Sequence, residues 1–158
     1  MLRPLLARDR GPLAALLRSV DSFGDADVEV ALELIDEVIA RASATSYRVL
    51  VALGTEEDEP LLGYVCFGAT PMTDTTFDLY WIAVDPRARG RGVAGVLCAA
   101  LEHHARETGA KNIRVETSSE DEYAAATRFY RRQGFDECGR IPDFYRVGED
   151  LLTFVKRV

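Results

Sequence analysis

The 158-residue sequence predicts one α+β domain, residues 1–158, with a mixed, mostly antiparallel sheet of about six to seven strands flanked by helices. An amphipathic helical pattern precedes three short apolar runs, which lie too close together for helices to connect them. Beyond these runs, helical and strand patterns alternate to the end of the chain. The first half therefore predicts an antiparallel meander, to which the second half adds strands through helical connections.

A short opening strand is expected at residues 2–5, followed by a helix over about 11–20. A loop-like stretch at 22–25 separates this helix from a second one. In the second helix, apolar residues recur at i, i+3, i+4, i+7, i+8 and i+11 and so share one face. These residues are Ala31, Leu34, Ile35, Val38, Ile39 and Ala42.

The meander strands are expected at residues 48–53, 61–69 and 77–84. Turn residues bound each run, and the polar segment 54–60 predicts a solvated hairpin loop.

Three further strands are expected at residues 112–117, 138–141 and 151–158. The first follows a helix over 93–105 that Gly109 terminates, and it is therefore expected to run parallel to the strand at 77–84. A helix that ends before Gly134 precedes the other two, and a polar and aromatic loop, 142–150, is expected between them.

Charge and composition limit the class of partner. The net charge of −7 argues against a nucleic-acid binder, which needs a basic surface. Cys66, Cys98 and Cys138 lie far apart, and adjacent His103 and His104 point in different directions on a helix, so we expect free thiols and no metal site. No segment has the length and apolarity of a membrane span or a signal peptide. We expect a cytoplasmic protein with no membrane partner.

The stretch VDPRARGRGVAG, residues 84–95, carries the strongest functional signal, with three arginines and three glycines between a predicted strand and a predicted helix. A helix N-terminus presents unpaired N–H groups and a partial positive charge, and glycine lets an anion approach the backbone. Arginines add charge-assisted hydrogen bonds to phosphate. The stretch therefore predicts a binding site for a polyanionic cofactor.

Other interpretations of this stretch fit less well. GRGVAG (90–95) satisfies the dinucleotide pattern GxGxxG, but Pro-Arg-Ala-Arg separates it from the strand, and that strand does not open a βαβ array. No Walker lysine is present for a nucleotide triphosphate. A glycine-rich helix start without a ligand is the structural alternative, although glycines there cost stability.

Three short motifs lie in and around this stretch and further along the chain: IAVDP (82–86), RGRGVA (89–94) and FYRRQGF (129–135). On these motifs the chain resembles the GNAT superfamily of acetyl-coenzyme A-dependent N-acetyltransferases over nearly its whole length. Residues 143–156 are similar to the last hairpin of many members. The resemblance implies a GNAT-like fold in which the parallel strands 77–84 and 112–117 splay apart and form the cofactor cleft.

The resemblance implies acetyl-CoA as cosubstrate and no metal. The backbone of Ile82, Ala83 and Val84 would pair with the pantetheine amides, and the Val84 N–H would polarise the thioester carbonyl. Arg87 and Arg91 are alternative contacts of the adenosine phosphate. The pyrophosphate would lie against the N–H groups of Arg89, Gly90, Arg91, Gly92, Val93, Ala94 and Gly95.

Two catalytic residues are implied by the resemblance. Tyr130 matches the family tyrosine that hydrogen-bonds the coenzyme sulfur and protonates the leaving thiolate, and a phenol has comparable basicity. Glu116 matches a glutamate that deprotonates the amine through water. The non-catalytic alternatives are that Tyr130 is only a core residue and that Glu116 is only a solvated carboxylate at the end of a strand. Tyr123 stands where many members have asparagine, which alters one contact to the cofactor arm. Other candidate bases are Asp78, Glu120, Asp121 and Glu122.

The expected function is therefore that of a GNAT-type acyltransferase that moves an acetyl group from acetyl-CoA directly to a primary amine of a small molecule or peptide. The alternative is a non-catalytic acetyl-CoA-binding sensor or assembly module. The acceptor, the acyl-chain preference and the assembly state, with a homodimer among the options, stay open. The expected acceptor pocket combines aromatic rings with carboxylates, from Phe23, Asp25, Trp81, Asp143, Phe144, Tyr145, Glu149 and Asp150.

Overall fold

The computed structural model describes residues 1–41, 44–54 and 60–158. Most of the hairpin loop predicted at 54–60, and Ala42 of the predicted helical stripe, lie outside the described residues. Among the helices that are described, none is long and apolar enough to cross a membrane.

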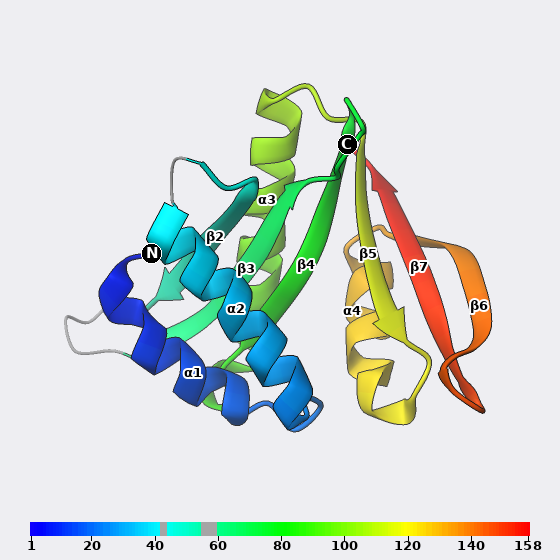
Figure 1. Cartoon of the computed structure of the whole chain (residues 1–158), viewed down its shortest axis with the longest axis horizontal. Coiled ribbons are helices and arrows are strands. Elements are labelled where there is room, and N and C mark those ends of the chain that lie inside the picture. The colour runs from blue at the N-terminus through cyan, green and yellow to red at the C-terminus, as the bar shows by residue number, and fades with distance from the viewer. Residues whose placement is uncertain (42–43, 55–59) are drawn as a thin grey trace. The chain divides into compact units, whose positions relative to one another are not determined.

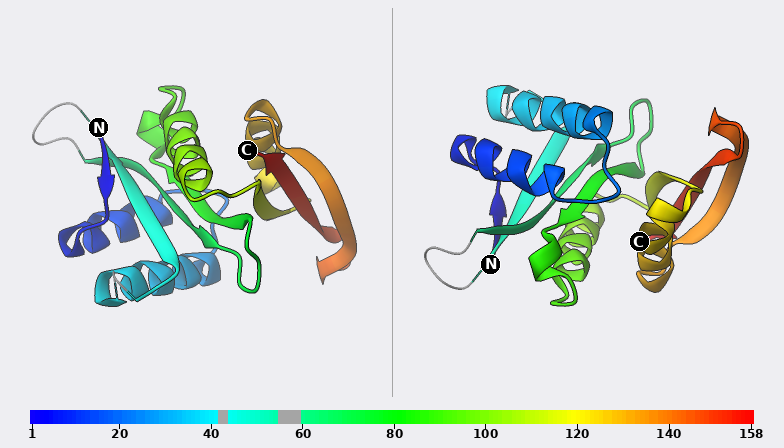
Figure 2. Two further views of the ribbon diagram at one scale, coloured as in Figure 1. Left: turned by 90° about the horizontal axis from the view of Figure 1, so that it is seen from above. Right: turned by 90° about the horizontal axis from the view of Figure 1, so that it is seen from below.

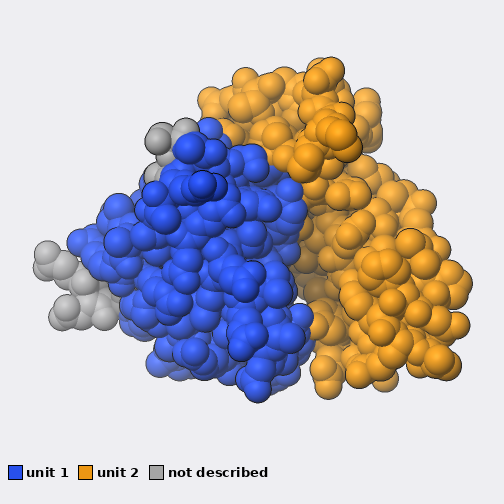
Figure 3. Space-filling model, viewed as in Figure 1, with its two compact units in different colours: residues 1–68, 80–101 blue, residues 69–79, 102–158 orange. Residues whose placement is uncertain are grey.

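The chain forms two compact units, shown in different colours in Figure 3. Unit 1 comprises Met1–Gly68 and Tyr80–Leu101, and unit 2 comprises Ala69–Leu79 and Glu102–Val158. The boundary between the units therefore runs through two strands and one helix.

The helical elements are η1 (Ala7–Asp9), α1 (Arg10–Arg18), α2 (Asp25–Arg41), η2 (Pro86–Ala88), α3 (Val93–Glu107), η3 (Asp121–Tyr123) and α4 (Ala124–Arg132), where η marks a short 3-10 turn. The strands are β1 (Leu2–Pro4), β2 (Tyr47–Leu53), β3 (Leu61–Ala69), β4 (Thr76–Val84), β5 (Asn112–Ser118), β6 (Asp136–Arg146) and β7 (Glu149–Arg157). They form a 7-stranded sheet in the order β1-β2-β3-β4-β5-β7-β6 (Figure 1).

The sheet is mixed. The pairs β1–β2, β2–β3, β5–β7 and β6–β7 are antiparallel, whereas β4 and β5 are parallel. This arrangement confirms the predicted α+β class and the predicted parallel pair. The β4–β5 ladder covers Thr76 to Asp78 on one strand and Asn112 to Arg114 on the other, although β4 continues to Val84 and β5 to Ser118.

In unit 1, α1 and α2 cover one face of the strands and α3 covers the other (Figures 1 and 2). The predicted apolar stripe of α2 lies on the core beneath these helices, where Ala31 and Ile35 are buried and its other described members are partly buried. The fully buried side chains of this core are Leu13, Leu17, Ile35, Val51 and Tyr64. Burial of one helix face against the sheet therefore explains the period of the pattern.

The predicted loop 142–150 is wrong for most of its length, because β6 runs to Arg146 and β7 begins at Glu149. The strand register shifts between Ile141 and Arg146, and Asp143 adopts a left-handed backbone with φ of 52°. A bulge of this kind keeps a polar, proline-containing segment within an edge strand. β6 is the last strand in the order of the sheet and, among the strands that the structure describes, pairs only with β7, and prolines within strands are found at such edges.

Candidate active site

In unit 1, β4 leads into α3 through η2 and two glycines with left-handed backbone. Gly90 and Gly92 both have φ of 77°, which glycine adopts without the steric cost of a side chain. A Cβ atom built at either position meets nothing within 4 Å, so the space beside this backbone is open. The sequence expectation of a backbone that a ligand can approach is consistent with this geometry.

The first turn of α3 lacks the groups that usually satisfy a helix N-terminus. Gly92 precedes the helix and has no side-chain oxygen to cap it, and the first turn contains no acidic residue. The Val96 N–H donates to the Gly92 carbonyl at 3.1 Å, and the N–H groups of Val93, Ala94 and Gly95 come too early for an intrahelical acceptor. This end of the helix fits an anionic group such as a pyrophosphate.

The arginines of this segment differ in their surroundings. Arg91 is exposed, and Arg89 is exposed with a long ion pair of 3.7 Å to Asp21. Arg87 instead binds the buried carboxylate of Asp85 at 2.7 Å. The Arg87 side chain, as the main cause, holds the pKa of the Asp85 carboxyl below its ordinary value.

The backbone predicted to bind pantetheine lies at the end of β4, where Ala83 is buried. A residue that the sequence prediction missed packs against it. A Cβ atom on Gly63 would lie 2.7 Å from the Ala83 carbonyl oxygen and 3.2 Å from side-chain carbons of Val84 and Val93. Glycine here lets β3 approach both the end of β4 and the start of α3. A glycine inside an apolar strand was the available sequence signal.

In unit 2, Glu116 and Tyr130 lie on opposite faces of the β5–β7 pair. Val115 is opposite Phe154, and Glu116 is opposite Thr153. Residues directly opposite share a face, and successive residues along a strand alternate faces. The Tyr130 ring lies 6.0 Å from the Phe154 ring, so α4 covers that face and Glu116 lies on the other.

Tyr130 is held in an aromatic cluster. Its ring centroid lies 5.6 Å from that of Phe129 and 5.8 Å from that of Phe135, and the residue is only 6% exposed. Aromatic packing of this kind restricts the movement of the Tyr130 ring.

Glu116 is part of an ion-pair chain that starts in β4. Arg114 Nε donates to Asp78 Oδ1 at 2.6 Å, and Arg114 Nη1 lies 3.5 Å from Glu116 Oε1. The Asp78 side chain is 8% exposed, whereas that of Glu116 is 43% exposed. Of these two candidate bases, Glu116 is therefore the one that a ligand can reach.

The remaining candidate bases lie at the end of β5 and in η3. Glu120 forms an ion pair with Arg146 of the β6–β7 hairpin. Asp121 and Glu122 are exposed in η3, and Tyr123, at the asparagine position of many family members, is half-buried at its end.

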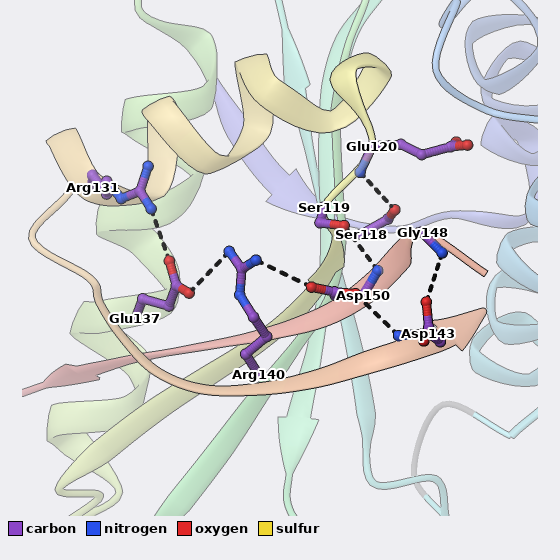
Figure 4. A network of polar contacts seen from close by, with 9 residues as sticks. All are labelled: Ser118, Ser119, Glu120, Arg131, Glu137, Arg140, Asp143, Gly148 and Asp150. Carbon is purple, nitrogen blue, oxygen red and sulfur yellow. Dashed lines mark hydrogen bonds and ion pairs between the residues drawn. The ribbon is translucent and has the colours of Figure 1, made fainter. Parts of the chain in front are cut away.

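The carboxylates of the β6–β7 hairpin form an internal network (Figure 4). The Asp143 N–H donates to Asp150 Oδ1 at 3.0 Å, and the Gly148 N–H donates to Asp143 Oδ1 at 2.6 Å. In the same hairpin, buried Glu149 accepts a hydrogen bond of 2.6 Å from Ser118 Oγ. These three carboxylates, predicted for the acceptor pocket, fix the hairpin and connect it to the end of β5.

The aromatic residues predicted for the acceptor pocket form two edge-to-face pairs. Phe144 and Tyr145 are exposed in unit 2 with ring centroids 5.0 Å apart. In unit 1, Phe23 and Trp81 pair at 5.3 Å, and Asp25 begins α2 nearby in the chain.

Comparison with known proteins identifies the family. The sequence model described as the acetyltransferase (GNAT) family matches residues 17–135. A crystal structure assigned to the GNAT family, from Desulfovibrio desulfuricans, superposes with a TM-score of 0.92 at 35% identity, covering 99% of this chain and 98% of that one. An aminoglycoside 6′-N-acetyltransferase solved with coenzyme A shares the fold with a TM-score of 0.74 at 16% identity, over 99% of this chain and 96% of the other.

Two curated relatives carry named activities. Mycothiol acetyltransferase of Brachybacterium faecium is 32% identical over 126 residues, which are 77% of this chain and 37% of that protein. Streptothricin acetyltransferase of Streptomyces lavendulae is 35% identical over 99 residues, which are 63% of this chain and 50% of that protein. The chain thus spans about a third to a half of the length of these relatives. The family match over most of the chain and the shared fold together show that it belongs to the GNAT family of acetyltransferases.

Proposed function

We propose that this GNAT acetyltransferase moves the acetyl group of acetyl-CoA directly to the primary amine of a small molecule. The observation that carries the proposal is the entrance of α3, where an uncapped, acid-free helix start follows two left-handed glycines with open space beside them. This backbone offers N–H donors and a partial positive charge to a diphosphate.

In the proposed complex, the backbone N–H groups of Gly90 and of Gly92 to Gly95 bind the pyrophosphate, and the side chains of Arg89 and Arg91 add charge at its edge. The pantetheine amides pair with the backbone of Ile82 to Val84, beyond Asp78, where the β4–β5 ladder ends. The Val84 N–H donates to the thioester carbonyl oxygen and stabilises the negative charge that develops there.

Glu116 and Tyr130 each carry out one proton transfer of the proposed reaction. Glu116, on the open face of β5, accepts a proton from the protonated amine through a water molecule. The neutral amine then attacks the acetyl carbon, so that a C–N bond forms, the C–S bond breaks, and the nitrogen releases its second proton to water as the neutral amide forms. Tyr130, on the α4 face, donates a proton to the departing sulfur, and its aromatic neighbours hold the phenol in place.

The proposed acceptor is a small-molecule amine because both named curated relatives acetylate small molecules according to their names. The exposed pair Phe144 and Tyr145 offers ring faces and edges for such a molecule, held by the hairpin network of Figure 4. A peptide amine is the competing acceptor class.

The test is release of free thiol from acetyl-CoA in the presence of pooled amines, with small amines, aminoglycosides, streptothricin-type antibiotics and peptides with free N-termini in separate pools. Tyr130→Phe runs in parallel, and thermal stabilisation by acetyl-CoA reports folding and binding in both proteins. We expect release in a small-molecule pool that the variant loses. Stabilisation without release in any pool would favour a non-catalytic acetyl-CoA sensor, and release only with peptides would reassign the acceptor.

A further inference from the structure

The ion pair between Asp85 and Arg87 lies immediately before the glycines that precede α3. Arg87 Nη2 donates to Asp85 Oδ2 at 2.7 Å, and Arg87 Nε donates to Asp85 Oδ1 at 3.0 Å. The same Asp85 Oδ1 accepts the backbone N–H of Arg87 at 2.8 Å. One carboxylate therefore fixes both the side chain and the main chain of Arg87.

Asp85 is itself fixed to the sheet. Its backbone N–H donates to the Leu62 carbonyl of β3 at 2.9 Å, and the residue is 6% exposed. The Arg87 side chain, in contrast, is 78% exposed. Asp85 is therefore buried and fixed to β3, and the exposed Arg87 side chain lies between its carboxylate and the solvent.

A series of tight turns continues from Asp85 to the glycines. The Ala88 N–H donates to the Asp85 carbonyl at 2.8 Å, and the Arg89 N–H donates to the Pro86 carbonyl at 3.3 Å. The Arg91 N–H then donates to the Ala88 carbonyl at 3.4 Å. Each turn starts on a residue that the preceding turn positions, so the direction of the backbone at the start of α3 depends on Asp85.

We infer that Asp85 and Arg87 are positioning residues that hold the anion-binding backbone in its binding conformation, and that Arg87 does not contact the adenosine phosphate. The Nε–Nη2 edge of the Arg87 guanidinium binds Asp85, so this edge is not available for a bidentate contact to phosphate. This inference rests on the proposed function for the identity of the anion, and it deepens that function by separating the arginines near the coenzyme into ligands and supports.

The first test measures the apo protein and so does not depend on coenzyme binding. Amide hydrogen exchange of the peptide covering residues 85–96 is compared in wild type, Arg87→Ala and Asp85→Asn. We expect exchange to be faster by about five- to thirty-fold in both variants, the factor that corresponds to releasing about one residue's backbone. Asp85→Asn retains a side chain of the native size, with one oxygen that can still accept the backbone N–H of Arg87.

The second test measures the affinities for coenzyme A and for 3′-dephospho-coenzyme A by calorimetry. A positioning role weakens both ligands by the same factor in Arg87→Ala. Arg10→Ala is the matched control, because Arg10 also makes a bidentate pair, with Asp36 at 2.8 and 2.9 Å, on α1 and α2. We expect Arg10→Ala to change neither the affinities nor the exchange.

The outcomes separate this inference from the proposed function. Loss of affinity for coenzyme A alone, with 3′-dephospho-coenzyme A unaffected, would make Arg87 a phosphate ligand and overturn the inference. Unchanged amide hydrogen exchange of residues 85–96 in both Arg87→Ala and Asp85→Asn would overturn it as well. If the wild-type protein bound neither coenzyme A nor 3′-dephospho-coenzyme A, the proposed function would be refuted. Faster amide exchange in Arg87→Ala and Asp85→Asn would still support the positioning role.

Discussion

Replacing Gly92 by valine tests the anion-binding backbone directly. Gly92 has φ of 77°, and a Cβ atom there meets nothing within 4 Å, so the space beside this position is open. The cost to folding is the left-handed conformation alone, about 1–2 kcal/mol. At about 2–4 °C per kcal/mol for a chain of this size, the melting temperature falls by about 2–8 °C.

The cost to cofactor binding is larger, because the new side chain projects into the open space where the pyrophosphate is proposed to lie. Each charge-assisted hydrogen bond that the anion loses is worth about 1.5–3 kcal/mol. The dissociation constant for acetyl-CoA therefore rises by about 10- to 150-fold for each bond lost. Calorimetric titration of the folded variant measures this change.

Gly109→Val is the matched control for this experiment. Gly109 follows α3 with φ of 81°, and nothing lies within 4 Å of its built Cβ atom either. It should show the same fall in melting temperature and an unchanged affinity for acetyl-CoA. Wild-type affinity in Gly92→Val, or an equal loss of affinity in Gly109→Val, would refute the assignment of the α3 entrance to the pyrophosphate.

Three further predictions address other parts of the molecule. Tyr130→Phe lowers kcat by about 10²- to 10⁴-fold with little change in acetyl-CoA affinity, as steady-state kinetics and calorimetry will show, and full activity would remove Tyr130 from the mechanism. Tyr64→Phe leaves the free energy of unfolding unchanged or raises it by up to about 1 kcal/mol, because the buried Tyr64 hydroxyl has no hydrogen-bond partner among the described residues; a clear loss in denaturant titrations would contradict this. Arg3, mainly through its hydrogen bonds, holds the pKa of the Asp9 carboxyl below its ordinary value, so the pair stabilises the fold above the unfolded pKa of about 4 and loses this effect as the pH falls below it. Arg3→Ala should thus be less stable than wild type at pH 7, with a difference that shrinks in acid, and a constant difference across the pH range would exclude this linkage.

The sequence predicted those parts of the fold whose patterns are set by burial. The stripe of α2 and the apolar runs of β2 to β4 follow directly from one-sided or two-sided contact with the core. The length of β6 was missed because this edge strand buries none of its residues, so no periodicity marks it. Its extension depends on the bulge at Asp143 and on hydrogen bonds from β7, which are properties of the folded hairpin rather than of the local sequence.

The candidate site was predictable where a local motif carries the chemistry. The glycines before α3 predict a backbone that a ligand can approach, and the space beside Gly90 and Gly92 is open; their left-handed conformation was not predicted. The role of Asp85 was not predictable, because nothing in the sequence shows which carboxylate an arginine two residues away will bind. The contacts of the hairpin carboxylates were not predictable either. Their composition suggested an attraction for cationic amines, whereas in the structure they form hydrogen bonds within the hairpin and to the end of β5.

The alternation of side chains along β5 has a direct chemical consequence for the proposed reaction. The amine must lose a proton on the side from which it approaches the acetyl carbon, and the sulfur must gain one on the side to which it departs. Val115 directs its side chain to the face that α4 covers with Tyr130, and the next residue, Glu116, is directed to the opposite face. In the proposed reaction, Glu116 and Tyr130 therefore act from opposite faces of the β5–β7 pair.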